Sequence, residues 1–368
     1  MAKNFTTKGR TMTRQTKILI AITLVMMLMV AACVSEPTGN TTGGGKKTGG
    51  PVRIGFSMDT LKEERWVRDK EEVEARAKEL GVELDVQVAN GDDALQRNQC
   101  DNLLTKGVDV LIVAPHNGEI AASIVEAAHR QNVPVISYDR LIKNSDVDLY
   151  VSHQVLKMGE MQAQYAMEHA PRGNYILIGG SQTDNNALLL RQGQMNILKP
   201  AVDRGDIKII SDQFAREWLA SEALRLTEDA LTRTSNDIQA IVASNDGTAG
   251  GAISALPAQL VGKVIVTGQD AELIACQRIV EGRQSMTVYK PIRPLAYSAV
   301  DAAMKFARGE KVDSADKINN GKIDVPSILQ TPVAVDKLNM ADTVVKDGYH
   351  KMEDVYKNVP KDQWPKQP

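Results

Sequence analysis

A short apolar run, VRIGFSM at residues 52–58, is followed by the amphipathic stretch WVRDKEEVEARAKEL at 66–80 and by a second run, ELDVQVAN, at 83–90. Gly81, directly after the amphipathic stretch, is a typical helix stop. A strand, a helix and a second strand in this order are typical of a parallel sheet, because parallel strands need a long crossover between them. The stretch therefore predicts an α/β fold built from βαβ units.

The same alternation continues along the chain, and amphipathic stretches such as 118–130 and 294–308 predict further helices. The part of the chain that follows the signal and the linker, from Val52 on, exceeds the roughly 250–300 residues that one hydrophobic core supports. We therefore expect two similar, doubly wound parallel-sheet domains. The further strand candidates are VDVLIVAP from Val108, VPVISYD from Val133, DLYVSH from Asp148, NYILIGG from Asn174, IKIISDQF from Ile207, IQAIVASN from Ile238, VIVTGQD from Val264 and SMTVYKPI from Ser285.

The chain is expected to cross between the two domains more than once. A late strand candidate, ILQTPVAV from Ile328, follows a polar stretch that runs through Gly321. The polar tail after Tyr356 is expected to be loosely ordered. The expected segments are a signal peptide at 1–32, a lipidated cysteine and flexible linker at 33–51, an N-terminal domain at 52–156 plus about 290–325, a C-terminal domain at 157–289 plus about 326–358, and a tail at 359–368.

The N-terminal segment has the features of a secretion signal. The first 17 residues carry five basic side chains and no acidic one, and an apolar run from Ile18 to Ala32 follows. The run has 15 residues, whereas a helix needs about 20 apolar residues to cross a bilayer, so a cleaved signal is favoured over a permanent anchor. The run ends in Val30-Ala31-Ala32-Cys33, which resembles the lipobox of bacterial lipoproteins, where the cysteine takes the lipid. An ordinary secretory signal with a chance cysteine is the alternative.

The linker, the charge and the remaining cysteines limit the possible partners. Residues 33–51 are rich in Gly, Thr and Lys without an apolar period, which is typical of a flexible tether. Without the five basic residues of the signal, 39 basic side chains stand against 46 acidic ones, a formal charge of −7, so no nucleic-acid partner is indicated. Cys100 and Cys276 allow at most one disulfide, and burial as small apolar groups is favoured.

Polar side chains that can form two hydrogen bonds at once gather at or just beyond the carboxyl ends of the strand candidates. In open parallel sheets ligands bind at this edge, because loops and helix N-termini converge there. Neighbouring sugar hydroxyls are each a donor and an acceptor, so paired Asp, Asn and Arg groups can hold two of them. The pattern therefore favours a sugar site. Its candidate residues are Asp59, Asp139, Arg140, Asp184, Asn185, Asn186, Asn245, Asp246, Gln269, Asp270 and Lys290.

Two tryptophans, Trp66 and Trp218, occupy similar places, because each opens a predicted helix after a strand and a loop. An indole offers a large rigid apolar face against which the C–H face of a sugar ring can stack. The two side chains can therefore sandwich a ring between them. The alternative is that each tryptophan packs on the core of its own domain.

Several of these residues also fit a role that involves no ligand. Asp and Asn are favoured helix N-caps, so for Asp246, which opens a predicted helix through Ala258, capping explains the residue at least as well as ligand contact. Arg140 and Lys290 can be solvated surface charges. His116 follows a strand and can line a cleft, but a loop histidine with its face in solvent is favoured.

Sequence motifs of catalysis are missing from the chain. No GxGxxG follows a strand, and neither GxxxxGK[ST] nor GxSxG occurs, so hydride, phosphoryl and acyl transfer lack their usual parts. The five histidines have no metal-ligand spacing. We therefore predict a protein that is not an enzyme, with no catalytic residue, no metal and no cofactor.

Six short motifs in a fixed order carry a resemblance to a known family. With them the chain resembles the bacterial periplasmic D-xylose-binding proteins, which are the substrate-binding proteins of ABC sugar transporters of the ribose-binding type. The resemblance runs from about Val52 to Glu353. The motifs are Glu64-Arg65-Trp66, Tyr138-Asp139-Arg140, Asp184-Asn185-Asn186, Ala243-Ser244-Asn245-Asp246, Gly268-Gln269-Asp270-Ala271 and Tyr289-Lys290-Pro291.

The resemblance implies a periplasmic-binding-protein-like receptor, in which two domains joined by a multi-segment hinge close on a monosaccharide, D-xylose, and hand it to an ABC transporter permease. It also implies a monomer. Where related proteins carry an aspartate after the first crossover strand, this chain has Ser152-His153-Gln154, so the hinge contacts there stay open. The implied sugar contacts are Arg65, Asp139, Arg140, Asp184, Asn186, Asn245, Asp270 and Lys290, with Trp66 and Trp218 as the stacking pair.

Two other functions share this fold. A sugar-responsive repressor would need an N-terminal helix-turn-helix where this chain has a signal and a tether. A sensor lipoprotein that presents sugar to a membrane receptor kinase or chemoreceptor would use the same residues, and it stays open as the alternative. The preferred monosaccharide also stays open, as does the periplasmic or cell-surface face of the membrane-anchored protein.

The lipobox predicts that Cys33 is the mature N-terminus and carries lipid. Replacement of the sulfur, Cys33→Ser, should move the protein from the membrane fraction to the soluble fraction, as measured by immunoblotting of fractionated cells. Membrane retention of a Cys33→Ser protein whose signal is still processed would contradict lipidation.

Overall fold

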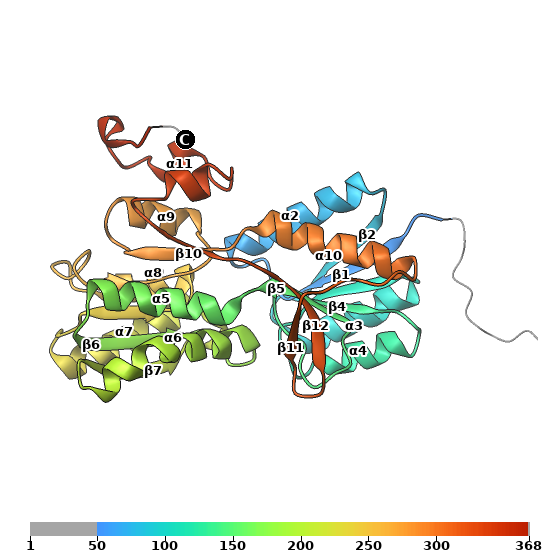
Figure 1. The fold of residues 1–368 in the computed structure, drawn as a ribbon, viewed down its shortest axis with the longest axis horizontal. Helices are drawn as coiled ribbons and strands as arrows, with labels where there is room; N and C mark the ends of the chain where they lie inside the picture. Colours follow the sequence, from blue (N-terminus) through green and yellow to red (C-terminus); the bar gives the residue numbers. More distant parts are fainter. Residues whose placement is uncertain (1–49, 367–368) are drawn as a thin grey trace, which may run out of the picture. The chain divides into compact units, whose positions relative to one another are not determined.

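The structure is a computed structural model that describes residues 50–366. The predicted signal peptide, the lipidation site Cys33 and most of the linker lie outside the described residues. From Pro51 onward the chain forms one compact unit, in which strands and helices alternate as the sequence predicts (Figure 1). Within the described range, no helix has the length and apolar character needed to cross a membrane.

The first lobe is built on a seven-stranded sheet with the order β11-β12-β5-β4-β3-β1-β2. All neighbouring strands pair in parallel except those of the β11–β12 hairpin, which are antiparallel. The strands are β1 (Arg53–Met58), β2 (Glu83–Val88), β3 (Val110–Ala114), β4 (Val135–Tyr138), β5 (Leu149–His153), β11 (Asp316–Asn319) and β12 (Asp324–Gln330).

Helices cover both faces of this sheet, because successive side chains of a strand point to opposite faces. Ile112 of β3 packs in the apolar cluster that includes helices α2 and α10, whereas its neighbours Leu111 and Val113 pack in the cluster of α3 and α4. Figure 1 shows the two pairs of helices on opposite sides of the sheet. The helices are α2 (Glu64–Glu79), α3 (Asp93–Thr105), α4 (Ala122–His129) and α10 (Ile292–Ala307).

The second lobe has a four-stranded parallel sheet with the order β7-β6-β8-β9 and a separate antiparallel pair, β10 and β13. Helices α5 and α6 share one apolar cluster with the larger sheet, and α7 and α8 share another. The strands are β6 (Gly173–Gly179), β7 (Ile207–Phe214), β8 (Ala240–Ala243), β9 (Ile265–Val266), β10 (Met286–Tyr289) and β13 (Val333–Asp336). The helices are α5 (Val155–His169), α6 (Asn185–Asp203), α7 (Ala220–Thr234), α8 (Asp246–Ala255), α9 (Leu273–Val280) and α11 (Met352–Val355), with short helical turns η1 (Arg216–Trp218), η2 (Ala341–Val345) and η3 (Lys361–Gln363).

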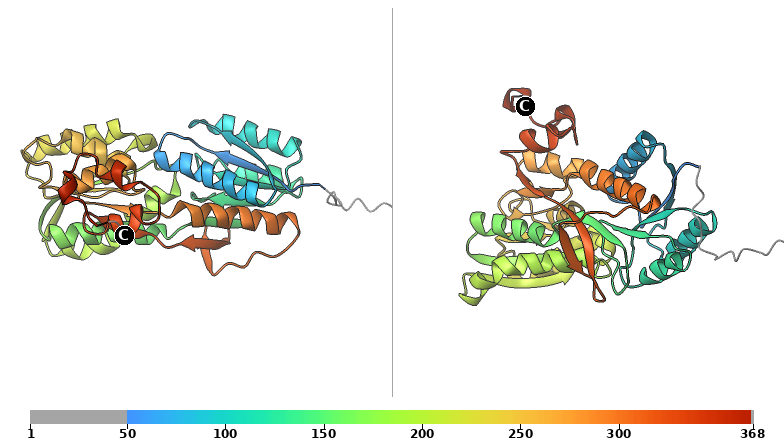
Figure 2. Two further views of the ribbon diagram at one scale, coloured as in Figure 1. Left: turned by 90° about the horizontal axis from the view of Figure 1, so that it is seen from above. Right: turned by 45° about the vertical axis from the view of Figure 1, so that its right-hand side comes forward.

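The chain passes between the lobes after β5, after β10 and after β12. The last passage differs from the expected boundary near residue 325, because β12 pairs in parallel with β5 as far as Gln330 and so belongs to the first lobe. The predicted strand from Ile328 is in fact two strands, since Pro332 has no N–H to continue a ladder and β13 starts at Val333. The right-hand view of Figure 2 shows the orange-red β11–β12 hairpin beside the green β5.

Smaller differences from the expected elements have local causes. The helix expected through Ala258 ends at Ala255, because Leu256 is extended ahead of Pro257. The tail is ordered as far as it is described: the indole N–H of Trp364 donates to the carbonyl oxygen of Val359 at 2.8 Å, and η3 lies within it. The expectation for the cysteines is confirmed, since Cys100 and Cys276 are both buried and unbonded to one another.

Helices α5 and α6 approach each other so closely that glycine is required on both. A Cβ atom on Gly159 would lie 2.1 Å from the carbonyl oxygen of Leu190, and one on Gly193 would lie 2.1 Å from that of Leu156. These oxygens belong to backbone that cannot move independently of its helix. The contact therefore fixes the spacing of the two helices that cover one face of the second sheet.

We predict that Gly193→Ala destabilises the protein, although alanine in a helix interior normally stabilises it by about 1 kcal/mol. The added methyl group must push the helices apart, and overpacking of this kind costs about 1–3 kcal/mol in the free energy of unfolding. Urea denaturation should show the loss. The neighbouring exposed Gln192→Ala should change stability by less than about 0.5 kcal/mol, and an unchanged Gly193→Ala midpoint would refute the contact.

Candidate functional site

One cavity lies where the carboxyl ends of the strands of both lobes meet. Each of the ten predicted sugar contacts lines it, and two further residues, Glu63 and Gln269, complete the lining. The segments that follow β1, β4, β6, β7, β8, β9 and β10 supply these side chains, some from loops and others, such as Arg65 and Asn186, from the first turn of a helix. The full lining is Glu63, Arg65, Trp66, Asp139, Arg140, Asp184, Asn186, Trp218, Asn245, Gln269, Asp270 and Lys290.

Asp139 is the centre of one buried group of charges. Its Oδ2 lies 2.6 Å from Arg65 Nη1 and 3.5 Å from Lys290 Nζ, and the same ammonium lies 3.0 Å from Asp270 Oδ1. Burial opposes ionisation of Asp139, but the charges of Arg65 and Lys290 outweigh it and hold the pKa of this carboxyl well below its usual value. The side chain is therefore a fixed carboxylate.

Arg65 is itself held by a residue that the sequence reasoning did not select. Its Nε and Nη2 donate to Asp69 Oδ2 at 2.9 and 2.7 Å, and the two residues are one helical turn apart on α2. The i, i+4 spacing of an Arg and an Asp was the available signal. Asp69 also accepts from the hydroxyl of Tyr138. The guanidinium is thus positioned before any ligand arrives.

Asp139 also has an unusual backbone. Its φ is 59°, in the left-handed region that few non-glycine residues adopt. The carbonyl oxygen of Asp139 accepts from Tyr150 Oη at 2.8 Å, from Ser152 Oγ at 2.7 Å and from Asn186 Nδ2 at 3.1 Å. Three donors, one of them from the second lobe, hold this strained turn in place, as is common at functional sites.

Arg140 joins carboxylates of both lobes. Its Nη1 lies 2.6 Å from Asp59 Oδ2 in the first lobe, and its Nε lies 2.9 Å from Asp184 Oδ2 in the second. Arg140 is only 6% exposed, so a solvated surface charge does not describe it. Asp184 also accepts from the N–H of Asn186 at the start of α6, and burial raises the pKa of Asp184 despite the adjacent guanidinium.

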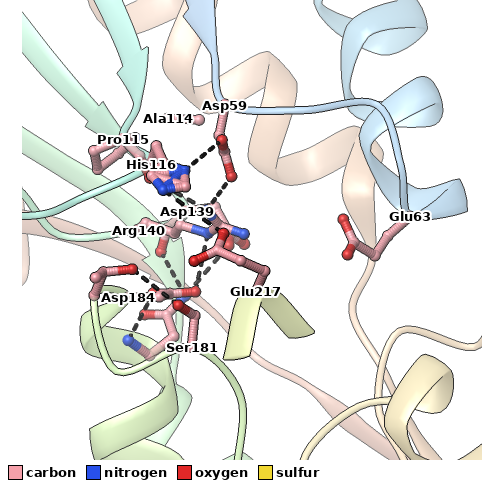
Figure 3. A network of polar contacts seen from close by, with 12 residues as sticks. Asp59, Glu63, Ala114, Pro115, His116, Asp139, Arg140, Ser181, Asp184 and Glu217 are labelled. Atoms are coloured by element: carbon pink, nitrogen blue, oxygen red, sulfur yellow. Dashed lines mark hydrogen bonds and ion pairs between the residues drawn. The ribbon is translucent and has the colours of Figure 1, made fainter. Parts of the chain in front are cut away.

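His116 differs from its prediction as a solvent-facing loop residue. It is 9% exposed, and its Nδ1 lies 3.1 Å from Asp59 Oδ1. Gln96 Oε1 accepts from the N–H of His116, which fixes the loop after β3. Figure 3 shows His116, Asp59, Arg140 and Asp184 in one connected set of polar contacts. His116 therefore lies behind Arg140 and supports its partner.

Both tryptophans line the cavity and also pack on their own lobes. Trp66 belongs to the core cluster of α2 and α10, and the guanidinium carbons of Arg65 and Arg140 lie 4.1 and 5.1 Å from its ring centroid. Trp218 lies over Gly180, where a Cβ would come within 2.2 Å of the ring. The structure thus fits the alternative that each tryptophan packs on the core of its own lobe. Stacking of a sugar ring between the two indoles stays a prediction.

Trp218 sits on a strained turn. Glu217 and Trp218 have φ values of 51° and 56°, so two consecutive non-glycine residues are left-handed. The Glu217 carbonyl oxygen accepts from Lys62 Nζ of the first lobe at 2.6 Å. A contact between lobes therefore fastens the turn that carries the indole.

Asp246 has neither of the two roles that the sequence left open for it, because Asn245 both caps α8 and lines the cavity. Asn245 lines the cavity and is the N-cap of α8, because its Oδ1 accepts from the N–H of Thr248 at 2.9 Å. Asp246 is outside the cavity lining and accepts from Gln284 and Thr287 in the lobe interior. Burial raises the pKa of Asp246 to about 7. Its role in the structure is internal support of the second lobe.

The segment Ser152-His153-Gln154 now has defined contacts at the lobe junction. His153 Nε2 lies 3.2 Å from the carbonyl oxygen of Pro291, and the N–H of Gln154 donates to the carbonyl oxygen of Gln330 at 3.0 Å. The first passage between the lobes therefore contacts each of the other two. Burial, together with the nearby ammonium of Lys290, lowers the pKa of His153 to about 3, so the imidazole is neutral at physiological pH.

The cavity is suited to a polar ligand without net charge. Its cations are paired with its carboxylates, and its Asp, Asn and Arg side chains present paired donors and acceptors beside two indole rings. Across residues 50–366, no group of three or more His, Cys, Asp or Glu side chains has the arrangement of a metal site. The chemistry of the lining is that of hydroxyl recognition.

The chain is similar to known proteins over most of its length. A periplasmic binding protein domain matches residues 54–311. The chain is 48% identical over 306 residues to the D-xylose-binding periplasmic protein of Haemophilus influenzae, and the match covers 83% of this chain and 92% of the relative. It is also 48% identical over 301 residues to the D-xylose-binding periplasmic protein of Escherichia coli, and this match covers 82% of the chain and 91% of the relative.

A solved structure has the same fold. The carbohydrate transporter solute-binding protein of Chloroflexus aurantiacus, in complex with D-glucose, superimposes with a TM-score of 0.78 at 32% identity, over 83% of this chain and 98% of that one. The family model, the two relatives and the fold all agree with the resemblance found in the motifs. This chain belongs to the periplasmic binding protein family, and it is similar over most of its length to the D-xylose-binding members of the ribose-binding type.

Proposed function

We propose that this protein binds D-xylose in the cavity between its lobes and delivers it to the permease of an ABC transporter. The observation that carries the proposal is the convergence on one cavity of twelve side chains from the segments that follow seven strands. Support for a pentose comes from the 48% identity to proteins named for D-xylose binding. The Chloroflexus structure holds D-glucose, so a hexose is the ligand against which D-xylose must be compared.

Delivery to a permease requires that the bound and free forms differ, and the lobe contacts supply such a difference. Asn186 Nδ2 donates to the carbonyl oxygen of Asp139 at 3.1 Å, and the N–H of Leu273 donates to Glu64 Oε2 at 2.8 Å. Both bonds join the two lobes and exist only while the lobes are together. A ligand that contacts both lobes stabilises this arrangement, because binding favours the state it contacts better.

We propose further that the protein is a monomeric lipoprotein, tethered outside the cytoplasm through Cys33. The basic N-terminus, the apolar run and the small residues before the cysteine support the anchor. The linker at 33–51 would then give the folded part freedom to reach a permease in the same membrane. The protein acts in this scheme by binding alone, without catalysis or a cofactor.

We predict that Arg140→Lys weakens D-xylose binding. The guanidinium holds Asp59 and Asp184 through two different nitrogens, and one ammonium cannot replace this planar fork. An unmade hydrogen bond in a buried site costs on the order of 1–3 kcal/mol, which is about tenfold or more in the dissociation constant. Isothermal titration calorimetry at neutral pH measures the change.

The matched control is Arg130→Lys, at the exposed C-terminal end of α4. This variant should bind D-xylose as the parent does, because its side chain lies outside the cavity lining. Equal affinities of Arg140→Lys and the parent would remove Arg140 from the sugar site. Absence of binding of any pentose or hexose by the parent would reject the proposed function itself.

A further inference from the structure

Glu63 occupies the position of a helix cap without acting as one. It is the N-cap residue of α2, with extended φ and ψ of −82° and 141°, and its side chain accepts no hydrogen bond from the first turn. Ser, Thr, Asp and Asn are the residues that favour this position, because their short side chains reach the free N–H groups. The Glu63 carboxylate is therefore available for another purpose.

One oxygen of this carboxylate is buried and has no partner. Oε1 pairs with Lys62 Nζ at 3.0 Å, whereas Oε2 has no hydrogen-bond partner, and the Glu63 side chain is 10% exposed. An unpaired buried acceptor costs free energy. In Figure 3 the carboxylate faces the labelled network, but no dashed line reaches it. Such an atom on the wall of a cavity indicates a missing donor.

The other unpartnered atoms of the cavity wall define the same kind of ligand. Among the described residues, Gln269 Oε1 and Trp218 Nε1 also line this cavity without a hydrogen-bond partner. Two free acceptors and one free donor match a molecule whose groups both donate and accept, which is the property of a hydroxyl. A carboxylate or phosphate ligand would offer Glu63 and Gln269 only further acceptors.

Glu63 also stands at one end of the cavity. Together with Arg140 and Trp218 it lines both the cavity and an adjoining compartment. Lys62, which pairs with Glu63, also donates to the Glu217 carbonyl oxygen across the lobes at 2.6 Å. The contact between lobes thus holds the Glu63 carboxylate beside the turn that carries Trp218.

We propose that Glu63 is a specificity-determining residue, whose Oε2 accepts a hydrogen bond from one sugar hydroxyl at the end of the ring that faces the adjoining compartment. The inference rests on the proposed function, because it requires a sugar in the cavity. A sugar that lacks this hydroxyl leaves Oε2 unpaired in a closed site, and discrimination between sugars follows from that cost. Glu63 thereby selects for a hydroxyl at one ring position.

The test pairs a protein variant with ligand variants. D-xylose and its 1-, 2-, 3- and 4-deoxy analogues are titrated by calorimetry into the parent and into Glu63→Met, which keeps the side-chain length without an acceptor oxygen. We expect Glu63→Met to lose about tenfold in D-xylose affinity. One deoxy analogue should bind the parent about as weakly as D-xylose binds Glu63→Met. Glu63→Met should bind this analogue no more weakly than it binds D-xylose.

Controls separate this inference from the proposed function. Glu119→Met replaces an exposed acid whose side chain is 65% accessible, and it should leave all five affinities unchanged. Glu63→Ala repeats the test if the Met variant melts below the parent. Each deoxy analogue can lose as much affinity in the Glu63 variants as it loses in the parent. That result would overturn the inference and leave the sugar site intact. A parent that binds no sugar would overturn both.

Discussion

The site depends on one constraint, which is that the Asp139 carboxylate is ionised and buried. A buried carboxylate is tolerated only when it is paired and hydrogen-bonded. Arg65 from α2 and Lys290 from the end of β10 supply the charges, and these two residues belong to segments on either side of the lobe junction. Asn186 from the second lobe then binds the Asp139 carbonyl oxygen. Separation of the lobes would therefore leave several of these groups to be solvated by water, so the arrangement of the charges and the closure of the lobes are coupled.

Pairing of charges within the protein also explains which ligands the cavity suits. Because Arg140 is held by Asp59 and Asp184, it offers a ligand directed hydrogen bonds with little net charge. Anionic ligands would have to displace these carboxylates, whereas neutral hydroxyls can join the existing pairs. The two indole rings add apolar faces for the C–H surface of a ring. Specificity then rests on the few atoms without partners, among them Glu63 Oε2.

Much of the fold and of the cavity lining could be predicted from the sequence, because both follow from two simple regularities. Alternating apolar runs and amphipathic stretches predicted most strands of the two larger sheets, but not β11, which lies in the stretch read as polar. The convergence of parallel strand ends predicted that residues as distant as Arg65 and Lys290 share one cavity. Partners set by tertiary packing were missed: the burial of His116 beside Asp59 has no periodic signal. The pairing of β12 with β5 was also missed. The run from Ile328 has the same composition before and after the point where the chain leaves the first lobe, so nothing in the sequence marks that point. Glu63 was missed because acids at helix starts are ordinary.

We propose that a sugar holds the two lobes together through groups drawn from both. Small-angle X-ray scattering of the protein with and without D-xylose measures this closure, with saturation verified by calorimetry on the same sample. We expect a smaller radius of gyration in the presence of D-xylose, because the free protein samples arrangements in which the contacts of Asn186 with Asp139 and of Leu273 with Glu64 are broken. Identical scattering curves for the free and the saturated protein would contradict it.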